Sequence, residues 1–118
     1  MVNAKKQQRI NKAMKLLSPQ YRTTPYDPKF NTHNTIEHEL AKCKVIFDLK
    51  KQGKEVYAEA IFRNGARADV FIPEDYRVIE ILHSETEKEA LTKKDYYPFS
   101  LDILFKTTDE VLNNGYRD

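Results

Sequence analysis

Two acidic residues, Asp69 and Glu80, stand on apolar stretches whose spacing would bring them together. Residues 66–82 are rich in β-branched and aromatic side chains around one short polar turn, so they predict two antiparallel strands. If the turn is centred between Glu74 and Asp75, Asp69 lies directly opposite Glu80 on the same face of the sheet. Directly opposed carboxylates repel each other, and a bound divalent cation is the simplest arrangement that stabilises such a pair. The sequence therefore predicts a metal site on this hairpin.

One domain with a hydrophobic core is expected from the length and composition. The chain has 118 residues, of which 40% are hydrophobic and 32% charged, enough to fold without disulfides. No apolar run approaches the roughly 20 residues of a transmembrane helix, and the N-terminal residues lack the apolar segment of a secretory signal. Cys43 is the only cysteine, and no zinc-binding pattern is present. We therefore expect an intracellular, cytoplasmic protein.

Positive charge is concentrated at the start of the chain. Residues 1–33 carry seven lysines and arginines but one acidic residue, whereas the remainder is net acidic. Apolar residues at helical spacing predict a helix over residues 3–17 whose opposite side is basic. The cations that we expect to contact phosphate groups are Lys5, Arg9, Lys12 and Lys15. A basic arm on an acidic body favours a nucleic-acid partner, and a solvated helix face without a partner is the alternative.

A second helix is expected over residues 35–52. Asn34 is a good N-cap residue, and Glu37 three positions later completes a capping box. The core-facing stripe of this helix is predicted to consist of Ile36, Leu40, Cys43, Ile46 and Phe47.

The remaining pattern completes an α/β order. The elements expected besides the first hairpin are a strand at 55–62, an Asn-Gly turn at 63–65, a helix at 85–94, a strand at 101–105 and a helix at 108–114. The fold class is therefore α/β, with a central mixed four-stranded sheet flanked by helices. The single domain divides into a basic helix and linker (1–34), a core (35–106), and a C-terminal helix and tail (107–118).

Four short motifs in this order resemble the PD-(D/E)XK nuclease superfamily, which has the restriction-endonuclease-like fold and includes the archaeal Holliday-junction resolvases. The motifs are Glu37-His38-Glu39-Leu40, the stretch from Leu49 to Val56, Arg67-Ala68-Asp69-Val70 and Val78-Ile79-Glu80-Ile81-Leu82. The resembling region covers about residues 35–106. The resemblance implies a metal-dependent phosphodiesterase that acts on DNA with Mg²⁺ or Mn²⁺.

The resemblance also implies roles for individual residues. Asp69 and Glu80 would coordinate the metal, with the backbone carbonyl of Ile81 as a further oxygen ligand. Glu37 would contribute from the helix, directly or through water, and Glu39 is the alternative for this role. Oxygen ligands of this kind suit Mg²⁺, which uses few carboxylates and keeps several waters, and the metal would polarise the scissile phosphate.

The chain departs from the superfamily pattern at Leu82, where a lysine would orient the attacking water. The predicted register places Arg67 opposite Leu82, so Arg67 is a candidate for the missing cation, although arginine is a poor general base. An Arg67 salt bridge that merely balances the acid pair is the alternative. Other lysines that could replace the missing one are Lys42, Lys93 and Lys94.

The other polar residues point less clearly to chemistry. Glu59 is a weaker candidate for the site, because its mid-strand position favours a solvated outer face. His38 and His83 are expected at the surface or half-buried. The function predicted is therefore metal-dependent hydrolysis of DNA, with a homodimer as a further expectation because cutting two strands requires two sites. The alternatives are a degraded nuclease that binds nucleic acid without cutting it, and an interaction protein whose acidic residues only form salt bridges.

Overall fold

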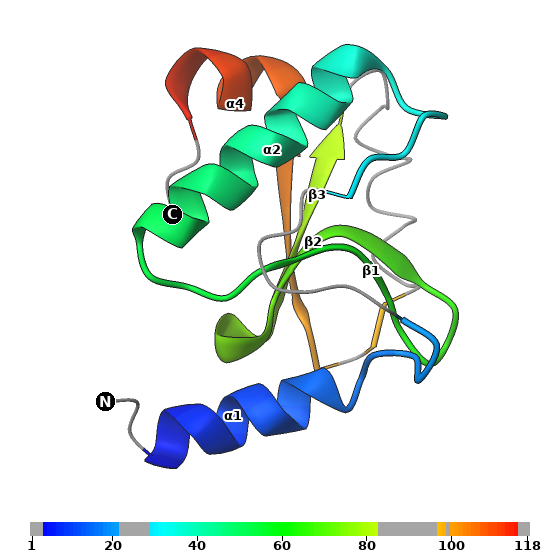
Figure 1. The fold of residues 1–118 in the computed structure, drawn as a ribbon, viewed down its shortest axis with the longest axis vertical. Coiled ribbons are helices and arrows are strands. Elements are labelled where there is room, and N and C mark those ends of the chain that lie inside the picture. Colours follow the sequence, from blue (N-terminus) through cyan, green and yellow to red (C-terminus); the bar gives the residue numbers. More distant parts are fainter. Residues whose placement is uncertain (1–3, 22–28, 83–96, 99, 116–118) are drawn as a thin grey trace.

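A computed structural model describes residues 4–21, 29–82, 97–98 and 100–115 of the chain. Its elements in chain order are α1 (Ala4–Met14), α2 (Ile36–Lys51), β1 (Tyr57–Ile61), β2 (Arg67–Ile72), the 3₁₀ turn η1 (Pro73–Asp75), β3 (Arg77–Leu82), β4 (Asp102–Thr107) and α4 (Thr108–Asn114) (Figure 1). The predicted helix at 85–94, with Lys93, Lys94 and the nearby His83, lies outside the described residues. None of the described helices is long and apolar enough to cross a membrane.

The four strands form one mixed sheet in the order β1-β2-β3-β4, which confirms the predicted α/β class. β1, β2 and β3 are antiparallel neighbours, and β4 runs parallel to β3. In the β2–β3 ladder Val70 lies opposite Ile79 and Phe71 opposite Val78. This is the register predicted from a turn centred on Glu74 and Asp75, and η1 makes that turn.

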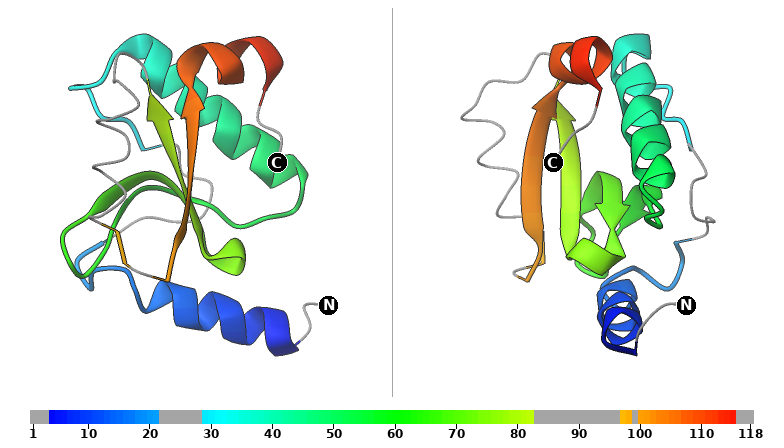
Figure 2. Two further views of the ribbon diagram at one scale, coloured as in Figure 1. Left: turned by 180° about the vertical axis from the view of Figure 1, so that it is seen from behind. Right: turned by 90° about the vertical axis from the view of Figure 1, so that its left-hand side faces the viewer.

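Helix α2 crosses one face of the sheet, with α4 beside its N-terminal half (Figures 1 and 2). Val45 and Leu49 of α2 are fully buried in one core cluster with Val70 and Ile79 of the sheet and with Val111 of α4. A side-chain capping box between Thr107 and Glu110 starts α4 directly after β4. The helix pair is therefore held to the sheet by aliphatic packing.

Helix α1 lies at the other end of the molecule, beside η1 (Figure 1). Ala13 and Leu17 pack there into a second core cluster that includes Phe62 and Phe71. The rings of Phe62 and Phe71 meet edge to face, with centroids 5.1 Å apart, which is a favourable aromatic geometry. The apolar side of α1 is thus used for packing, and its basic side is left outside.

The predicted core stripe of the second helix is wrong. Ile36, Leu40 and Phe47 are 70%, 52% and 57% exposed, and Cys43 is half-buried; of the predicted stripe only Ile46 is buried. The buried aliphatic residues of α2 are Ala41, Val45, Ile46 and Leu49. Toward the N-terminus of α2 the same buried face carries the polar residues His38, Glu39 and Lys42. Because these side chains are polar, hydrophobic periodicity favoured the wrong side of the helix.

The start of α2 also differs from the prediction by one residue. Thr35, rather than Asn34, is the N-cap, and its hydroxyl accepts a hydrogen bond from the amide of His38 at 3.2 Å. Glu37 therefore does not occupy the N3 position, and the predicted capping box is absent at this end of α2.

Candidate functional site

Asp69 of β2 and Glu80 of β3 are brought together, as their spacing predicted. Hydrogen bonding with the Glu80 side chain is one cause of the lowered pKa of Asp69. The backbone amide of Ile81 donates a second hydrogen bond to Asp69 Oδ2 at 2.8 Å. Burial alone would raise the pKa of Asp69, but the hydrogen bonds from His38, Glu80 and the Ile81 amide outweigh it and lower that pKa.

His38 connects this acid pair to α2. Its Nε2 lies 3.3 Å from Asp69 Oδ2, and its Nδ1 lies 3.1 Å from Glu39 Oε2. Burial disfavours the charged imidazolium, but the hydrogen bonds and charges of Asp69 and Glu39 raise the pKa of His38 to about 9. His38 is 8% exposed, so its expected surface or half-buried position is wrong, and it is an internal cation between two carboxylates.

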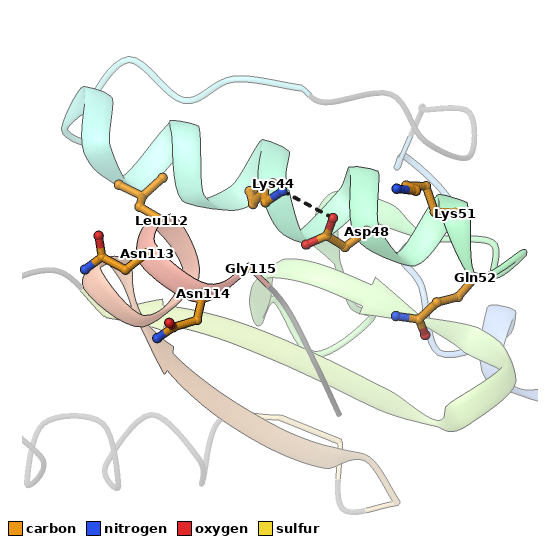
Figure 3. Close-up of a pocket in the computed structure, with 8 residues that line it drawn as sticks. All are labelled: Lys44, Asp48, Lys51, Gln52, Leu112, Asn113, Asn114 and Gly115. Atoms are coloured by element: carbon orange, nitrogen blue, oxygen red, sulfur yellow. Dashed lines mark ion pairs between the residues drawn. The ribbon is translucent and has the colours of Figure 1, made fainter.

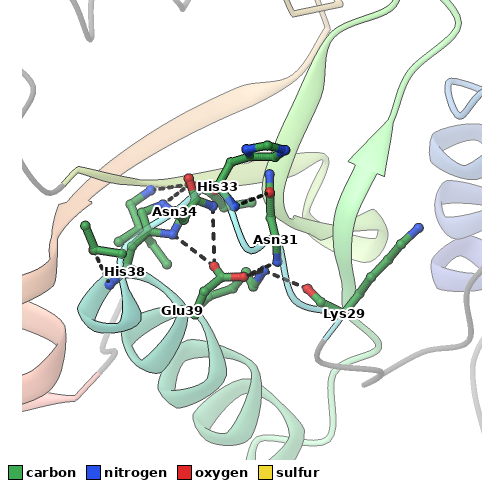
Figure 4. A network of polar contacts seen from close by, with 10 residues as sticks. Lys29, Asn31, His33, Asn34, His38 and Glu39 are labelled. Carbon is green, nitrogen blue, oxygen red and sulfur yellow. Dashed lines mark hydrogen bonds and ion pairs between the residues drawn. The ribbon is translucent and has the colours of Figure 1, made fainter.

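Glu39 and Lys42 form a buried ion pair one turn further along α2. Lys42 Nζ lies 2.8 Å from Glu39 Oε1 and also donates to the carbonyl of Lys29 at 2.7 Å. Glu39 additionally accepts hydrogen bonds from the amide of Asn31 and from Asn34 Nδ2 (Figure 4). Burial would raise the pKa of Glu39, but the hydrogen bonds from Lys42, Asn31 and His38 lower it. The carboxylate is therefore held in its charged form.

Of the two acidic residues weighed on α2, the structure brings Glu39 to the cluster and leaves Glu37 outside it. Glu37 is exposed, whereas Glu39 is buried beside His38. On a helix, residues three and four positions apart lie on one face, and this spacing places Lys42 next to both Glu39 and His38. The polar face of α2 turned toward the sheet thus consists of His38, Glu39 and Lys42.

Glu59 of β1, the weaker of the acidic candidates in the sequence, is a buried acid. It is 5% exposed, and its Oε1 has no hydrogen-bond partner among the described residues. Its φ of 51° is unusual for a non-glycine residue, and such conformations cost about 1–3 kcal/mol and cluster at functional sites. Burial raises the pKa of Glu59. The expected solvated outer position of Glu59 is wrong.

The register explains why Glu59 belongs to the cluster. Ala58 pairs with Val70 and Ala60 with Ala68, so Glu59 lies across from Asp69 on the neighbouring strand. Glu59 also experiences the charges of Lys42 and Asp69. Asp69 is thus the central residue, with an acid on either side of it in the sheet.

A cavity of about 210 Å³ opens beside Glu59. Its charged lining residues are Glu59, Lys29 and Arg67, and Phe30, Asn31, Thr32 and Ile61 complete the wall. Arg67 is exposed and pairs with Ile61 of β1. The structure therefore places Arg67 at the mouth of this cavity, where its guanidinium could meet an anionic ligand near the acid cluster.

The acid cluster contains oxygen donors of the kind that bind a divalent cation. No group of three or more His, Cys, Asp and Glu side chains among the described residues is arranged to hold a metal ion. The hydrogen-bonded pair Asp69 and Glu80 nevertheless supplies hard oxygen donors, and Mg²⁺ is commonly bound by one or two carboxylates and several waters. The donor chemistry fits such an ion once His38 no longer contacts the Asp69 carboxylate.

The four cations predicted to contact phosphate also come together. Lys5, Arg9, Lys12 and Lys15 line one cavity of about 490 Å³ along α1, with Gln8, Asn11 and Tyr76. Arg9 donates a hydrogen bond to the carbonyl of Glu74 at 3.1 Å, which anchors α1 to η1. This surface, defined by those seven residues, is called the α1 groove below.

A third hollow, of about 540 Å³, lies between α2 and α4 (Figure 3). It is lined by Lys44, Asp48, Lys51, Gln52, Leu112, Asn113, Asn114 and Gly115. Among the described residues that line it, Asp48 is the one acidic side chain, and Lys44 lies 3.5 Å from that carboxylate. None of the residues of the acid cluster or of the α1 groove lines this hollow.

In comparisons with protein-family models, curated proteins and solved structures, no significant match to the chain was found.

Proposed function

We propose that this protein is a metal-dependent nuclease of restriction-endonuclease-like architecture that hydrolyses phosphodiester bonds in DNA. The observation that carries the proposal is the pair of half-buried Asp69 and buried Glu80, with His38 and the buried ion pair of Glu39 and Lys42 beside it. Buried charges cost several kcal/mol each unless they are well compensated, and strongly perturbed ionisable groups gather at functional sites. The element order agrees with this reading: a helix, three antiparallel strands, and a fourth strand parallel to the third.

Three acidic residues of the cluster, Asp69, Glu80 and Glu39, have defined tasks in this proposal. Asp69 and Glu80 hold a Mg²⁺ or Mn²⁺ ion, with the carbonyl of Ile81 as a further oxygen donor. The bound metal supplies Lewis acidity toward the scissile phosphate. Glu39 takes the helical role for which Glu37 was the first candidate, because Glu39 is the acid that faces the sheet.

Lys42 supplies the cation that Leu82 lacks. Its ammonium group is held between Glu39 and the carbonyl of Lys29, on the face of α2 turned toward the acids. From there it stabilises negative charge that develops on the phosphate. Arg67 provides a second cation at the cavity beside Glu59, where it binds a phosphate group rather than acting as a base.

A second function, DNA binding without cleavage, is favoured by one specific observation. His38 and Lys42 already neutralise the carboxylates of Asp69 and Glu39 inside the protein. A site that has lost metal binding would be expected to keep such internal counter-ions, since they make the buried acids tolerable without a metal.

One assay separates these functions. The wild-type protein and the variants Asp69→Asn and Glu80→Gln are incubated with supercoiled and branched DNA in Mg²⁺ or Mn²⁺, with Asp48→Asn as the matched control outside the cluster. Metal-dependent cutting that is lost in the first two variants and kept in the control supports the nuclease. If the wild type binds DNA without cutting it, the result supports the alternative function. If it neither binds nor cuts DNA, the result supports an interaction protein.

The role of Arg67 and the expected homodimer are tested alongside. Arg67→Ala should weaken cleavage mainly through substrate binding, and unchanged cleavage would remove Arg67 from the site. Sedimentation equilibrium of the wild-type protein, with and without branched DNA, measures whether a dimer forms.

A further inference from the structure

The α1 groove combines positive charge with an aromatic side chain. Its four cations, Lys5, Arg9, Lys12 and Lys15, share the cavity of about 490 Å³ with Tyr76, and no acidic side chain among the described residues lines it. Helix α1 itself contains no acidic residue. Cations at this spacing suit a phosphate backbone, but charge alone does not distinguish one form of nucleic acid from another.

The acidic residues of the adjoining turn are neutralised by other lysines. Glu74 lies 3.2 Å from Lys6, and Asp75 lies 2.7 Å from Lys54. Neither of these two lysines lines the α1 groove. The ion pairs therefore reduce the negative charge beside the groove without engaging the side chains of its four cations.

Tyr76 is held in place by the turn. It has a φ of 50° in the left-handed region, as the residue that ends η1. Its amide donates to the carbonyl of Pro73 at 3.1 Å, and its carbonyl accepts from the amide of Asp102 at 2.8 Å. A non-glycine residue in this conformation is strained and is often found at binding sites. The turn thus fixes the backbone of Tyr76, and its half-buried side chain packs against the second core cluster and lines the basic groove.

We propose that the α1 groove binds an unpaired segment of a DNA strand, with a base stacked on Tyr76 and the flanking phosphates on the four cations. In a duplex the faces of the bases are covered by their neighbours, whereas an unpaired base exposes a face that an aromatic side chain can cover. Gln8 and Asn11 add hydrogen-bonding groups on the same wall. This inference rests on the proposed nuclease function, and it names the substrate class as branched or partly single-stranded DNA.

Binding is measured by fluorescence anisotropy in EDTA, so that no cleavage occurs. The probes are a labelled oligothymidylate and a blunt duplex of the same length, with oligouridylate and an acidic polypeptide as further arms. We expect the wild type to bind the thymidylate more tightly than the duplex. Tyr76→Leu should weaken thymidylate binding by roughly tenfold or more, because a base–aromatic stack is lost. Tyr76→Phe, which keeps the aromatic face, should bind like the wild type.

The cations are tested with Lys12→Gln and Lys15→Gln, and Lys50→Gln on α2 is the matched control. The two groove variants should weaken binding of both DNA probes and reduce the salt dependence, while the control changes neither. Photocrosslinking of the wild type to an iodouracil oligonucleotide gives a readout that needs no variant. We expect the crosslink at Tyr76.

The inference is overturned if the duplex binds as tightly as the thymidylate, if the acidic polypeptide competes equally well, or if crosslinks form away from the groove. These outcomes are separate from those of the cleavage assay. A protein that binds single strands through Tyr76 but never cuts DNA would refute the nuclease alone, and cutting that does not depend on Tyr76 would refute the groove alone.

Discussion

His38 Nε2 lies 3.3 Å from Asp69 Oδ2 and joins the first turn of α2 to the second strand of the sheet. The contact places a cation against the central acid of the cluster. It also links two segments that are far apart in the sequence. The packing of α2 on the sheet and the protonation of His38 therefore depend on one another.

This contact makes stability depend on pH. The pKa of His38 is raised to about 9 from an ordinary value near 6.5, so its protonation stabilises the folded state. That contribution is complete below about pH 6.5 and is lost as the pH rises through about 9. In EDTA, the free energy of urea unfolding should fall by about 2–3 kcal/mol over this range.

The same titration with His38→Gln provides the control. Glutamine retains hydrogen-bonding capacity but does not titrate, so the fall between pH 6.5 and 9 should largely disappear. Equal pH dependence in the variant and the wild type would contradict the assignment of the raised pKa to His38.

The two acids of the first turn of α2 should behave differently in cleavage. Glu39→Gln removes the carboxylate that holds Lys42 and His38, and activity should fall about 10–100-fold or more, as is typical for residues that support metal ligands. Glu37→Gln changes an exposed side chain of the same type and should retain activity. Initial rates on the best DNA substrate measure both, and the opposite ranking would restore Glu37 to the site.

The buried ion pair of Lys42 and Glu39 can be measured by a double-mutant cycle. Lys42→Met leaves the Glu39 carboxylate buried without its main partner, and should cost about 3–5 kcal/mol in the free energy of unfolding. The double variant Lys42→Met/Glu39→Gln should cost clearly less than the two single changes together. Lys44→Met breaks an exposed pair with Asp48 and should cost less than about 1 kcal/mol. If the destabilisation by Lys42→Met and that by Glu39→Gln sum to that of the double variant, the two residues do not interact.

The orientation of α2 is tested by one substitution at two positions. Leu49→Ala empties a fully buried site and should destabilise the protein by about 2–5 kcal/mol. Leu40→Ala changes a side chain that is 52% exposed and should cost less than about 1 kcal/mol. Thermal unfolding of the two variants decides between two faces of the helix. The observed face requires Leu49→Ala to be the more destabilising change, and the stripe predicted from periodicity requires Leu40→Ala to be the more destabilising change.

The sequence by itself determined the register that places Asp69 beside Glu80. Side chains alternate strictly along a strand, so a short turn leaves one pairing that keeps the apolar residues on common faces. The Asn-Gly turn between β1 and β2 was recognisable for a similar local reason, since Gly65 has a φ of 89° that few other residues tolerate. The basic side of α1 followed from helical periodicity and charge.

Only the tertiary structure decided which residues complete the site. The inner face of α2 combines Ala41, Val45 and Leu49 with the charged side chains of His38, Glu39 and Lys42, so it looks less hydrophobic than the outer face that carries Leu40 and Phe47. Glu59 became part of the cluster because its strand lies across from Asp69 and its backbone adopts a rare conformation. Local patterns record how polar a side chain is, but the compensation that allows a charge to be buried comes from partners elsewhere in the chain, and those partners meet only in the folded protein.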